Sequence, residues 1–228
     1  MLLALPRFCA IIDRSPEASG RPELPLPFDF RSGHPERSRG VDEIARMLTG
    51  AGVRLIQVRA KQATTQALLD ETRQLLSLLP TDSLLIVNDR ADVAQLAGAA
   101  GVHLGQDDLP VDAARALLGP EKIIGWSTHN AAQVEAGDSL PVDYLAFGPI
   151  FATATKADTE PVVGLAGLRE ARRLTRKPLM AIGGITPASA AAAIEAGADS
   201  VAVITGWMAA PDIPARLEEF RRTLGRLD

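Results

Sequence analysis

The sequence predicts a single-domain α/β protein, a closed (β/α)8 TIM barrel over residues 1–228. Short apolar runs alternate with helical patterns along the chain, which indicates parallel strands covered by helices. Aromatic residues make up 4% of the chain, which favours this architecture over an aromatic-rich β-sandwich. Eight strand–helix units in this length point to a closed barrel. The alternative, an open doubly wound sheet, would need a G-x-G-x-x-G loop that residues 11–20 do not contain.

The expected strands are apolar runs that are bounded by turn residues and are too short to form helices. Runs of this kind are typical of parallel strands buried on both faces. In chain order they are residues 8–12, 53–58, 84–88, 102–104, 123–126, 144–148, 179–184 and 200–204.

The expected helices lie between these runs and carry apolar residues at helical spacing. The segment 187–197 shows the start and stop signals most clearly, with Pro187 in its first turn and Gly197 at its end. After a first helix that follows the loop described next, the helices are expected at residues 64–79, 91–99, 111–118, 131–137, 165–175, 187–197 and about 208–225.

Residues 14–40 interrupt this regular alternation. The segment is rich in proline, glycine, serine and arginine, which predicts a long loop between the first strand and the first helix. Loops of this length are uncommon in compact domains, so we expect a lid over the site or a partly disordered segment. In a barrel this loop lies on the catalytic face, although His34 within it is expected to be a surface residue.

Composition narrows the class of protein and of partner. The net charge of −4 does not suggest a nucleic-acid or membrane-surface binder, and the oligomeric state stays open. The one cysteine, Cys9, lies in an apolar run and is expected to be a core residue. The start of the chain lacks the pattern of a signal peptide, and no apolar run is long enough for a membrane span. A soluble, cytoplasmic protein is expected.

Three cations follow strands of the predicted barrel, and the carboxyl ends of those strands meet at one mouth. Arg59 and Lys61 follow the second strand, and Lys156 follows the sixth. Each cation alone could be a solvated strand end. Together, in a chain of negative net charge, they predict a phosphate or pyrophosphate ligand.

Two carboxylates follow neighbouring strands at the same mouth. Asp89 ends the third strand and Asp108 follows the fourth, and either could instead cap a helix or a turn. Together with Asn88 and the cations, the pair is expected to hold Mg²⁺, which uses one or two carboxylates and phosphate oxygens. Asp107 is expected to be a turn residue.

The other strand ends supply small and polar residues. Glycines after the seventh strand and backbone N–H groups after the eighth occupy the usual phosphate site of barrel enzymes. His103 lies inside the fourth strand and is expected to be a hydrogen-bonded core residue, whereas His129 could reach a ligand or cap the next helix. The remaining candidates at the mouth are Gln57, Ser127, Thr153, Thr155, Gly183, Gly184, Ile204 and Thr205.

The order and spacing of seven segments resemble the thiamine-phosphate synthase family. The resemblance covers about residues 41–206 and the first strand. The segments are "IQVRAK" (56–61), "VNDRADVA" (87–94), "GVHLGQDDLP" (101–110), "IIGWSTHN" (123–130), "DYLAFGPIFATATK" (143–156), "PVVGLAGL" (161–168) and "AIGGITP" (181–187).

This resemblance implies a barrel transferase. Members join 4-amino-2-methyl-5-hydroxymethylpyrimidine diphosphate to 4-methyl-5-(2-phosphooxyethyl)thiazole and release pyrophosphate. The implied reaction is dissociative, with Mg²⁺ at Asp89 and Asp108 and no obligatory general base, and Arg59, Lys61, Ser127 and Lys156 are expected to act in catalysis.

The resemblance also implies two substrate sites. Gln57, Arg59, Lys61, Asn88 and Lys156 would hold the pyrimidine diphosphate, with Ser127 beside the reacting ring. The thiazole phosphate would be held by Thr153, Thr155, Gly183, Gly184, Ile204 and Thr205. Two positions depart from the family pattern. Ala60 stands where glutamate is usual, and Thr205 where serine is common.

Two other functions fit the same fold. A thiazole tautomerase would need the thiazole phosphate site and an acid–base histidine such as His129, but not Arg59, Asp89 and Asp108 together. A non-catalytic sensor would bind a phosphate ligand without Mg²⁺-dependent turnover. The joint presence of the cations and carboxylates favours the synthase.

Overall fold

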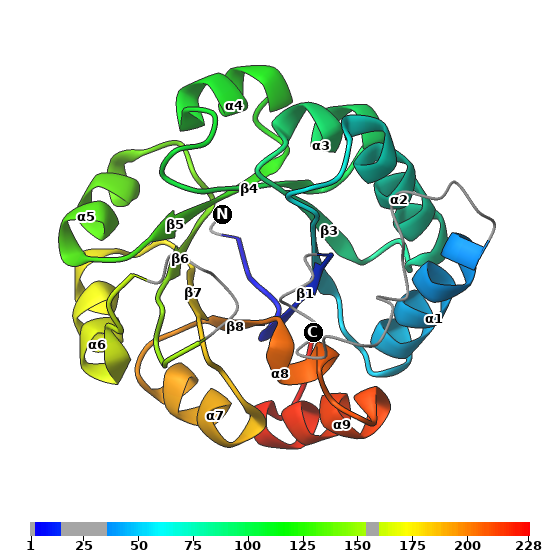
Figure 1. Cartoon of the computed structure of the whole chain (residues 1–228). Coiled ribbons are helices and arrows are strands. Elements are labelled where there is room, and N and C mark those ends of the chain that lie inside the picture. Colours follow the sequence, from blue (N-terminus) through cyan, green and yellow to red (C-terminus); the bar gives the residue numbers. More distant parts are fainter. Residues whose placement is uncertain (1–2, 15–35, 154–159) are drawn as a thin grey trace.

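The protein is a closed barrel of eight parallel strands in chain order, surrounded by helices, which confirms the predicted (β/α)8 architecture (Figure 1). The computed structural model describes residues 3–14, 36–153 and 160–228. The strands are β1 (Phe8–Asp13), β2 (Leu55–Arg59), β3 (Leu84–Asn88), β4 (Gly101–Leu104), β5 (Ile123–Thr128), β6 (Tyr144–Phe147), β7 (Leu179–Ile182) and β8 (Ser200–Val203). Each one overlaps an apolar run in the sequence.

The helices match the sequence patterns at most positions and differ at both ends of the chain. They are α1 (Glu36–Gly50), α2 (Thr65–Leu78), α3 (Ala91–Ala97), α4 (Val111–Leu118), α5 (Ala131–Ser139), α6 (Gly164–Leu174), α7 (Pro187–Glu195), α8 (Thr205–Met208) and α9 (Ile213–Leu224). The loop expected at residues 14–40 is shorter than predicted, because α1 already begins at Glu36. The rest of that loop, with His34, lies outside the described residues.

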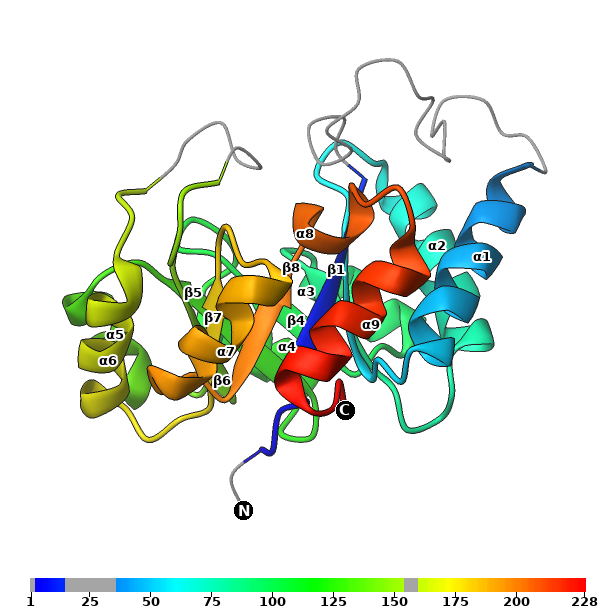
Figure 2. The same ribbon diagram turned by 90° about the horizontal axis from the view of Figure 1, so that it is seen from below.

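The last helix expected at 208–225 is in fact two helices. The short helix α8 follows β8 directly, and α9 begins after Asp212, whose side chain accepts a hydrogen bond from the N–H of Ala215 at 2.9 Å. Trp207 anchors α8, because its side chain is fully buried and its Nε1 donates to the carbonyl of Val203 at 3.0 Å. In the side view α8 lies beyond the carboxyl ends of the strands, at the end that we call the mouth (Figure 2).

Two apolar cores stabilise the fold. The larger core lies between the strands and the surrounding helices. The smaller core fills the barrel and includes Cys9, Ile11 and Tyr144. Burial raises the pKa of the Cys9 thiol to about 12, so Cys9 stays protonated and belongs to the core as predicted. Leu3 and Leu5 pack against this inner core. The segment that precedes β1 lies at the end of the barrel opposite the mouth, which we call the floor (Figure 2).

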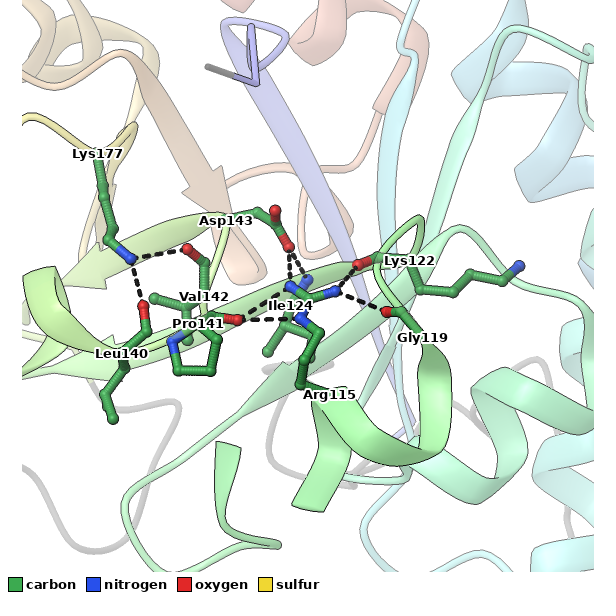
Figure 3. A network of polar contacts seen from close by, with 9 residues as sticks. All are labelled: Arg115, Gly119, Lys122, Ile124, Leu140, Pro141, Val142, Asp143 and Lys177. Carbon is green, nitrogen blue, oxygen red and sulfur yellow. Dashed lines mark hydrogen bonds and ion pairs between the residues drawn. The ribbon is translucent and has the colours of Figure 1, made fainter. Parts of the chain in front are cut away.

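The floor is held together by a partly buried network of charges (Figure 3). Arg115 on α4 donates to the carbonyls of Gly119, Lys122 and Pro141 and to Asp143 Oδ2, the last at 2.6 Å. The same Asp143 oxygen accepts the N–H of Ile124 on β5 at 2.7 Å. This arrangement ties a helix end to the starts of two strands. None of the described helices is both long and apolar enough to cross a bilayer.

Candidate active site

A buried ion pair forms the β1–β2 side of the mouth. Arg59 Nη1 lies 2.5 Å from Asp13 Oδ2, and the Asp13 side chain is fully buried. The two residues are direct partners in the parallel register of β1 and β2, so both side chains point into the barrel. Sequence reasoning missed Asp13. The alternation Cys9, Ile11, Asp13 along β1 was the signal that could have found it.

Two amide side chains face the same space. Gln57 precedes Arg59 by two residues on β2, and Asn88 is the last residue of β3, paired in register with His103. Gln57 is almost fully buried. Two predicted site residues therefore present amides next to a guanidinium, and such groups can orient a diphosphate or a ring nitrogen.

Asp89 has an unusual backbone. Its φ is +62°, and it is the only non-glycine residue with a positive φ in the described part of the chain. The N–H of Arg90 donates to the carbonyl of Asn88 at 2.8 Å, and the N–H of Asp89 donates to the carbonyl of His103 at 2.8 Å. These bonds hold a tight, strained turn, and such strain is concentrated at functional sites.

The structure does not use Asp89 as a helix cap. The residue before α3 is Arg90, and no side-chain hydrogen bond caps this helix. Asp108 does have a local role, because its Oδ2 accepts the N–H of Gly105 at 2.6 Å and closes the turn after β4. The sequence left open that each aspartate only caps a helix or a turn. Asp108 does cap a turn, whereas Asp89 does not cap a helix.

The two carboxylates lie against each other. The pKa of Asp89 is raised to about 6, chiefly by burial and then by the hydrogen bond and charge of Asp108, while Lys61 and Arg59 act to lower it. Lys61 Nζ lies 3.6 Å from Asp89 Oδ2 and is half exposed. Two adjacent carboxylates, one of them with a raised pKa, are the arrangement expected where a cation belongs.

The donor set fits Mg²⁺ only in part. Two carboxylates supply the hard oxygen ligands that this ion prefers. The described residues contain no group of three or more His, Cys, Asp or Glu side chains able to hold a metal. The remaining ligands would therefore come from water and from a phosphate-bearing substrate, which is the usual way that Mg²⁺ is bound in enzymes that act on phosphates.

A cavity of about 260 Å³ occupies the β5–β8 side of the mouth. Six of the predicted site residues line it, namely Ser127, Thr153, Gly183, Gly184, Ile204 and Thr205. The wall also contains Asp107, which was expected to be a turn residue and does lie in a turn, and Glu160, which sequence reasoning missed. This cavity lies beside the carboxylate pair, since Asp107 and Asp108 are neighbours in the chain.

The glycines after β7 are required by the backbone. Gly183 has φ +98° and Gly184 has φ +63°. A Cβ atom at Gly183 would meet Pro149 Cα at 2.6 Å, and one at Gly184 would meet the carbonyl oxygen of Ala152 at 2.5 Å. The turn that needs glycine is thus the same turn that brings backbone to the cavity wall.

His129 lines the cavity and does not cap α5. Asn130 caps that helix, with its side chain accepting the N–H of Gln133 at 3.0 Å. The Nδ1 of His129 lies 2.6 Å from the carbonyl oxygen of Gly148, which fixes the ring. His103 is buried and hydrogen-bonded, as expected, but it faces the barrel interior and contacts Ser127.

Two predicted site residues lie outside the part of the chain that the structure describes. Thr155 and Lys156 lie among residues 154–159, which the structure does not describe. The described part of the site therefore contains two of the three predicted cations, both carboxylates, both amides and most of the predicted phosphate contacts. Such a mouth can bind two phosphorylated molecules side by side, one against the carboxylates and one in the cavity.

Comparison with known proteins agrees with this geometry. Residues 32–207 match the thiamine monophosphate synthase family. The chain is 49% identical to a thiamine-phosphate synthase of Koribacter versatilis over 79% of this chain and 84% of the relative. It is 42% identical to one of Azorhizobium caulinodans, over 88% and 96%. A solved thiamine phosphate pyrophosphorylase from Pyrococcus furiosus superposes with a TM-score of 0.77 at 30% identity, covering 96% of this chain and 95% of that one.

Proposed function

The chain belongs to the thiamine monophosphate synthase family, and from this premise we propose that it is a transferase that makes thiamine phosphate. The substrates are 4-amino-2-methyl-5-hydroxymethylpyrimidine diphosphate and 4-methyl-5-(2-phosphooxyethyl)thiazole, and the second product is pyrophosphate. The observation that supports this assignment most strongly is the pair Asp89 and Asp108 beside Arg59, Lys61 and a cavity lined by backbone glycines.

The β1–β4 side is proposed to bind the pyrimidine diphosphate. Arg59, Lys61 and, outside the described residues, Lys156 would neutralise the leaving diphosphate, while Gln57 and Asn88 orient it. Asp13 holds the Arg59 guanidinium in place. Mg²⁺ at Asp89 and Asp108 would stabilise charge on the diphosphate oxygens.

The β5–β8 side is proposed to bind the thiazole phosphate. Gly183, Gly184, Ile204 and Thr205 bring backbone to the cavity wall, and Thr153 adds a hydroxyl, with Thr155 proposed alongside it. Ser127 lies on this wall and, through His103, next to the β4 side of the mouth. Holding the thiazole nitrogen against the pyrimidine carbon that loses pyrophosphate makes the bond-forming step effectively unimolecular within the complex, which supplies a large part of the rate.

Few acid–base groups are needed in this reaction. The aminopyrimidine itself expels pyrophosphate, and the thiazole nitrogen attacks without losing a proton. The departures noted in the sequence leave these roles in place. Ala60 is buried in the core between strands and helices, and Thr205 retains the position at the start of α8. A cytoplasmic location and small-molecule partners are part of the same proposal.

A thiazole tautomerase is the second candidate, because His129 lines the cavity. Its Nδ1 is bonded to Gly148, so Nε2 is the nitrogen available to move a proton. That activity would leave the carboxylate pair and Arg59 without a role.

The test is to incubate the purified protein with both substrates and Mg²⁺ and to measure thiamine phosphate and pyrophosphate. We expect both products in equal amounts and none when a chelator is added. Lys61→Met should lower the rate, whereas Lys122→Met, whose lysine bonds the Ala99 carbonyl at the floor, should not. If the thiazole phosphate is isomerised and no thiamine phosphate forms, the protein is a tautomerase and the synthase proposal is wrong.

A further inference from the structure

Three polar side chains form a hydrogen-bonded chain inside the barrel and end at the cavity. His103 Nδ1 lies 2.9 Å from the hydroxyl of Tyr144, and His103 Nε2 lies 2.9 Å from Ser127 Oγ. Tyr144 and His103 are buried, and Ser127 is partly exposed on the cavity wall. None of the roles proposed above uses Tyr144 or the His103 side chain.

The register of the strands makes this contact possible. Gly125 on β5 is the register partner of both His103 on β4 and Tyr144 on β6. A Cβ atom at Gly125 would lie 2.0 Å from the Tyr144 ring, so only glycine lets the two side chains meet across the middle strand. The two rings stack with centroids 5.5 Å apart and planes 25° from parallel. The imidazole therefore has a fixed orientation.

Burial determines which atoms of these three hydrogen-bonded side chains carry the hydrogens. Tyr144 is fully enclosed, and burial raises the pKa of its phenol well above the usual range, so the hydroxyl keeps its hydrogen. A buried O–H needs an acceptor, and among the described residues His103 Nδ1 lies at hydrogen-bond distance from it. A neutral imidazole whose Nδ1 accepts carries its hydrogen on Nε2. That Nε2–H donates to Ser127 Oγ, which leaves the serine's own hydrogen free to point into the cavity.

We propose that His103 is a positioning residue, held by Tyr144 as the Nε2–H tautomer. It makes the Ser127 hydroxyl donate its hydrogen to an acceptor atom of the bound pyrimidine diphosphate, at the edge of the cavity where the reacting pyrimidine ring meets the thiazole. The identity of that substrate rests on the proposed function. The opposite tautomer would turn the Ser127 hydrogen away from the cavity and toward His103, so that Ser127 could only accept hydrogen bonds from a ligand. The choice of tautomer at a buried histidine thereby sets what the serine can recognise.

His103 also supports the carboxylate side of the mouth, through its backbone. Its carbonyl oxygen accepts the N–H of Asp89 at 2.8 Å, which helps to hold the strained turn. Side-chain variants of His103 keep this carbonyl. They separate the effect on Ser127 from the effect on Asp89.

The tautomer can be measured without any substrate. In protein labelled with ¹⁵N-histidine, the His103 signals, assigned by their loss in His103→Gln, should show a protonated Nε2 and an unprotonated Nδ1. Tyr144→Phe should convert this into a mixture or into the Nδ1–H form. An Nδ1–H tautomer in the unaltered protein would overturn the proposal. This result does not depend on the reaction, so it stands even if no thiamine phosphate is formed.

Kinetics then test the role. His103→Gln retains an amide N–H able to reach Ser127 Oγ, whereas His103→Leu retains only bulk. We expect Leu to lower kcat by about 10- to 100-fold with KM changed less than about twofold, and Gln to recover most of that loss. Equal losses for Leu and Gln, or a loss confined to KM, would contradict the proposal. If circular dichroism shows that His103→Leu is unfolded, the kcat of Tyr144→Phe tests the same role of His103. We expect it to lower kcat several-fold with an unchanged KM, and unchanged kcat would overturn the proposal.

Discussion

The floor and the mouth of the barrel are built from the same kinds of charged side chain, and they differ in what those side chains touch. At the floor, Arg115 donates to three carbonyls and to Asp143, which also accepts a backbone N–H of β5 (Figure 3). Two strand–helix units later the arrangement repeats. Arg172 binds Asp199 at 2.9 Å, and Asp199 Oδ2 accepts the N–H of Leu179 on β7 at 2.8 Å.

At the mouth, one charged residue has a strained backbone and lies close to other charged side chains. Asp89 has a left-handed backbone and a raised pKa because burial and Asp108 disfavour its charge. Lys61 lies 3.6 Å from Asp89 and is half exposed. Charges at the floor are thus satisfied within the chain and contribute to the free energy of unfolding. At the mouth, Arg59 is likewise paired with Asp13, whereas Asp89, Asp108 and Lys61 are proposed to bind groups that the chain itself does not supply. Substitutions at the two ends should therefore affect different quantities.

The largest expected effect is on activity at the mouth. Asp89→Asn should lower the coupling rate by about 100-fold or more, because it removes one of the two proposed metal ligands. Asparagine tolerates φ +62°, so the free energy of unfolding should change by less than about 1 kcal/mol. Rate assays and urea unfolding check both numbers. Asp82→Asn, at an exposed ion pair with Arg54, is the matched control. Unchanged turnover in Asp89→Asn would remove the metal assignment.

The next effect is on stability at the floor. Arg115→Ala should lower the free energy of unfolding by about 2–3 kcal/mol and Tm by roughly 5–10 °C, because it leaves Asp143 and several carbonyls without their donor. The kcat of the folded enzyme should stay the same. Arg221→Ala is the control, since it removes only an exposed pair with Glu218. Loss of kcat in Arg115→Ala at a temperature where it is folded would break the distinction between the two ends.

The sequence predicted the strands of the barrel better than it predicted the helices at the two ends of the chain. The apolar runs predicted all eight strands, because a buried parallel strand needs a continuous apolar segment. The helix α8 was not predicted, because four residues carry no periodicity and Trp207 holds it through tertiary packing. The start of α1 at Glu36 was missed because the surrounding segment has the composition of a loop.

At the site, the residues at strand ends were predictable and their partners were not. Arg59 and Asp89 follow apolar runs, which marks them in the sequence. Asp13 is the register partner of Arg59, and Tyr144 meets His103 across Gly125. The alternation along β1 marks Asp13 as an inward-facing residue, but it does not say which side chain Asp13 meets. Register between parallel strands is fixed by the packing of the whole barrel, so the contacts at Asp13 and His103 required the structure.

Metal binding should be weaker at low pH, because of the raised pKa of Asp89. Because its pKa in the folded protein is raised to about 6, the protonated carboxyl contributes stability at low pH that is lost as the pH rises through that value. Mg²⁺ competes with this proton. With pyrophosphate present, Mg²⁺ at about ten times its Kd should stabilise the protein by about 1.4 kcal/mol above this pKa and much less well below it. Thermal unfolding across the pH range measures the difference, and Asp89→Asn should abolish it. Equal stabilisation at both pH values would contradict the mechanism.

The smallest effect is expected at a floor lysine. Lys177 Nζ donates to the carbonyls of Leu140 and Val142, and burial lowers the pKa of this amine (Figure 3). Lys177→Met removes these bonds but also removes a desolvated charge, so the free energy of unfolding should fall by less than about 1 kcal/mol. Lys177→Ala, which also loses the packing of the side-chain stem, should cost more. Chemical denaturation of both variants sharpens the estimate of what floor charges contribute.

The most direct test of the mouth as a ligand site is to locate the metal. Crystals of the protein grown with Mn²⁺ and pyrophosphate should give an anomalous peak between Asp89 and Asp108, about 2.1 Å from a carboxylate oxygen of each and from pyrophosphate oxygens. The floor, where the carboxylates of Asp143 and Asp199 are bonded to arginine and backbone N–H, should show no peak. Pyrophosphate bound at the mouth with no metal between the two aspartates would contradict the account.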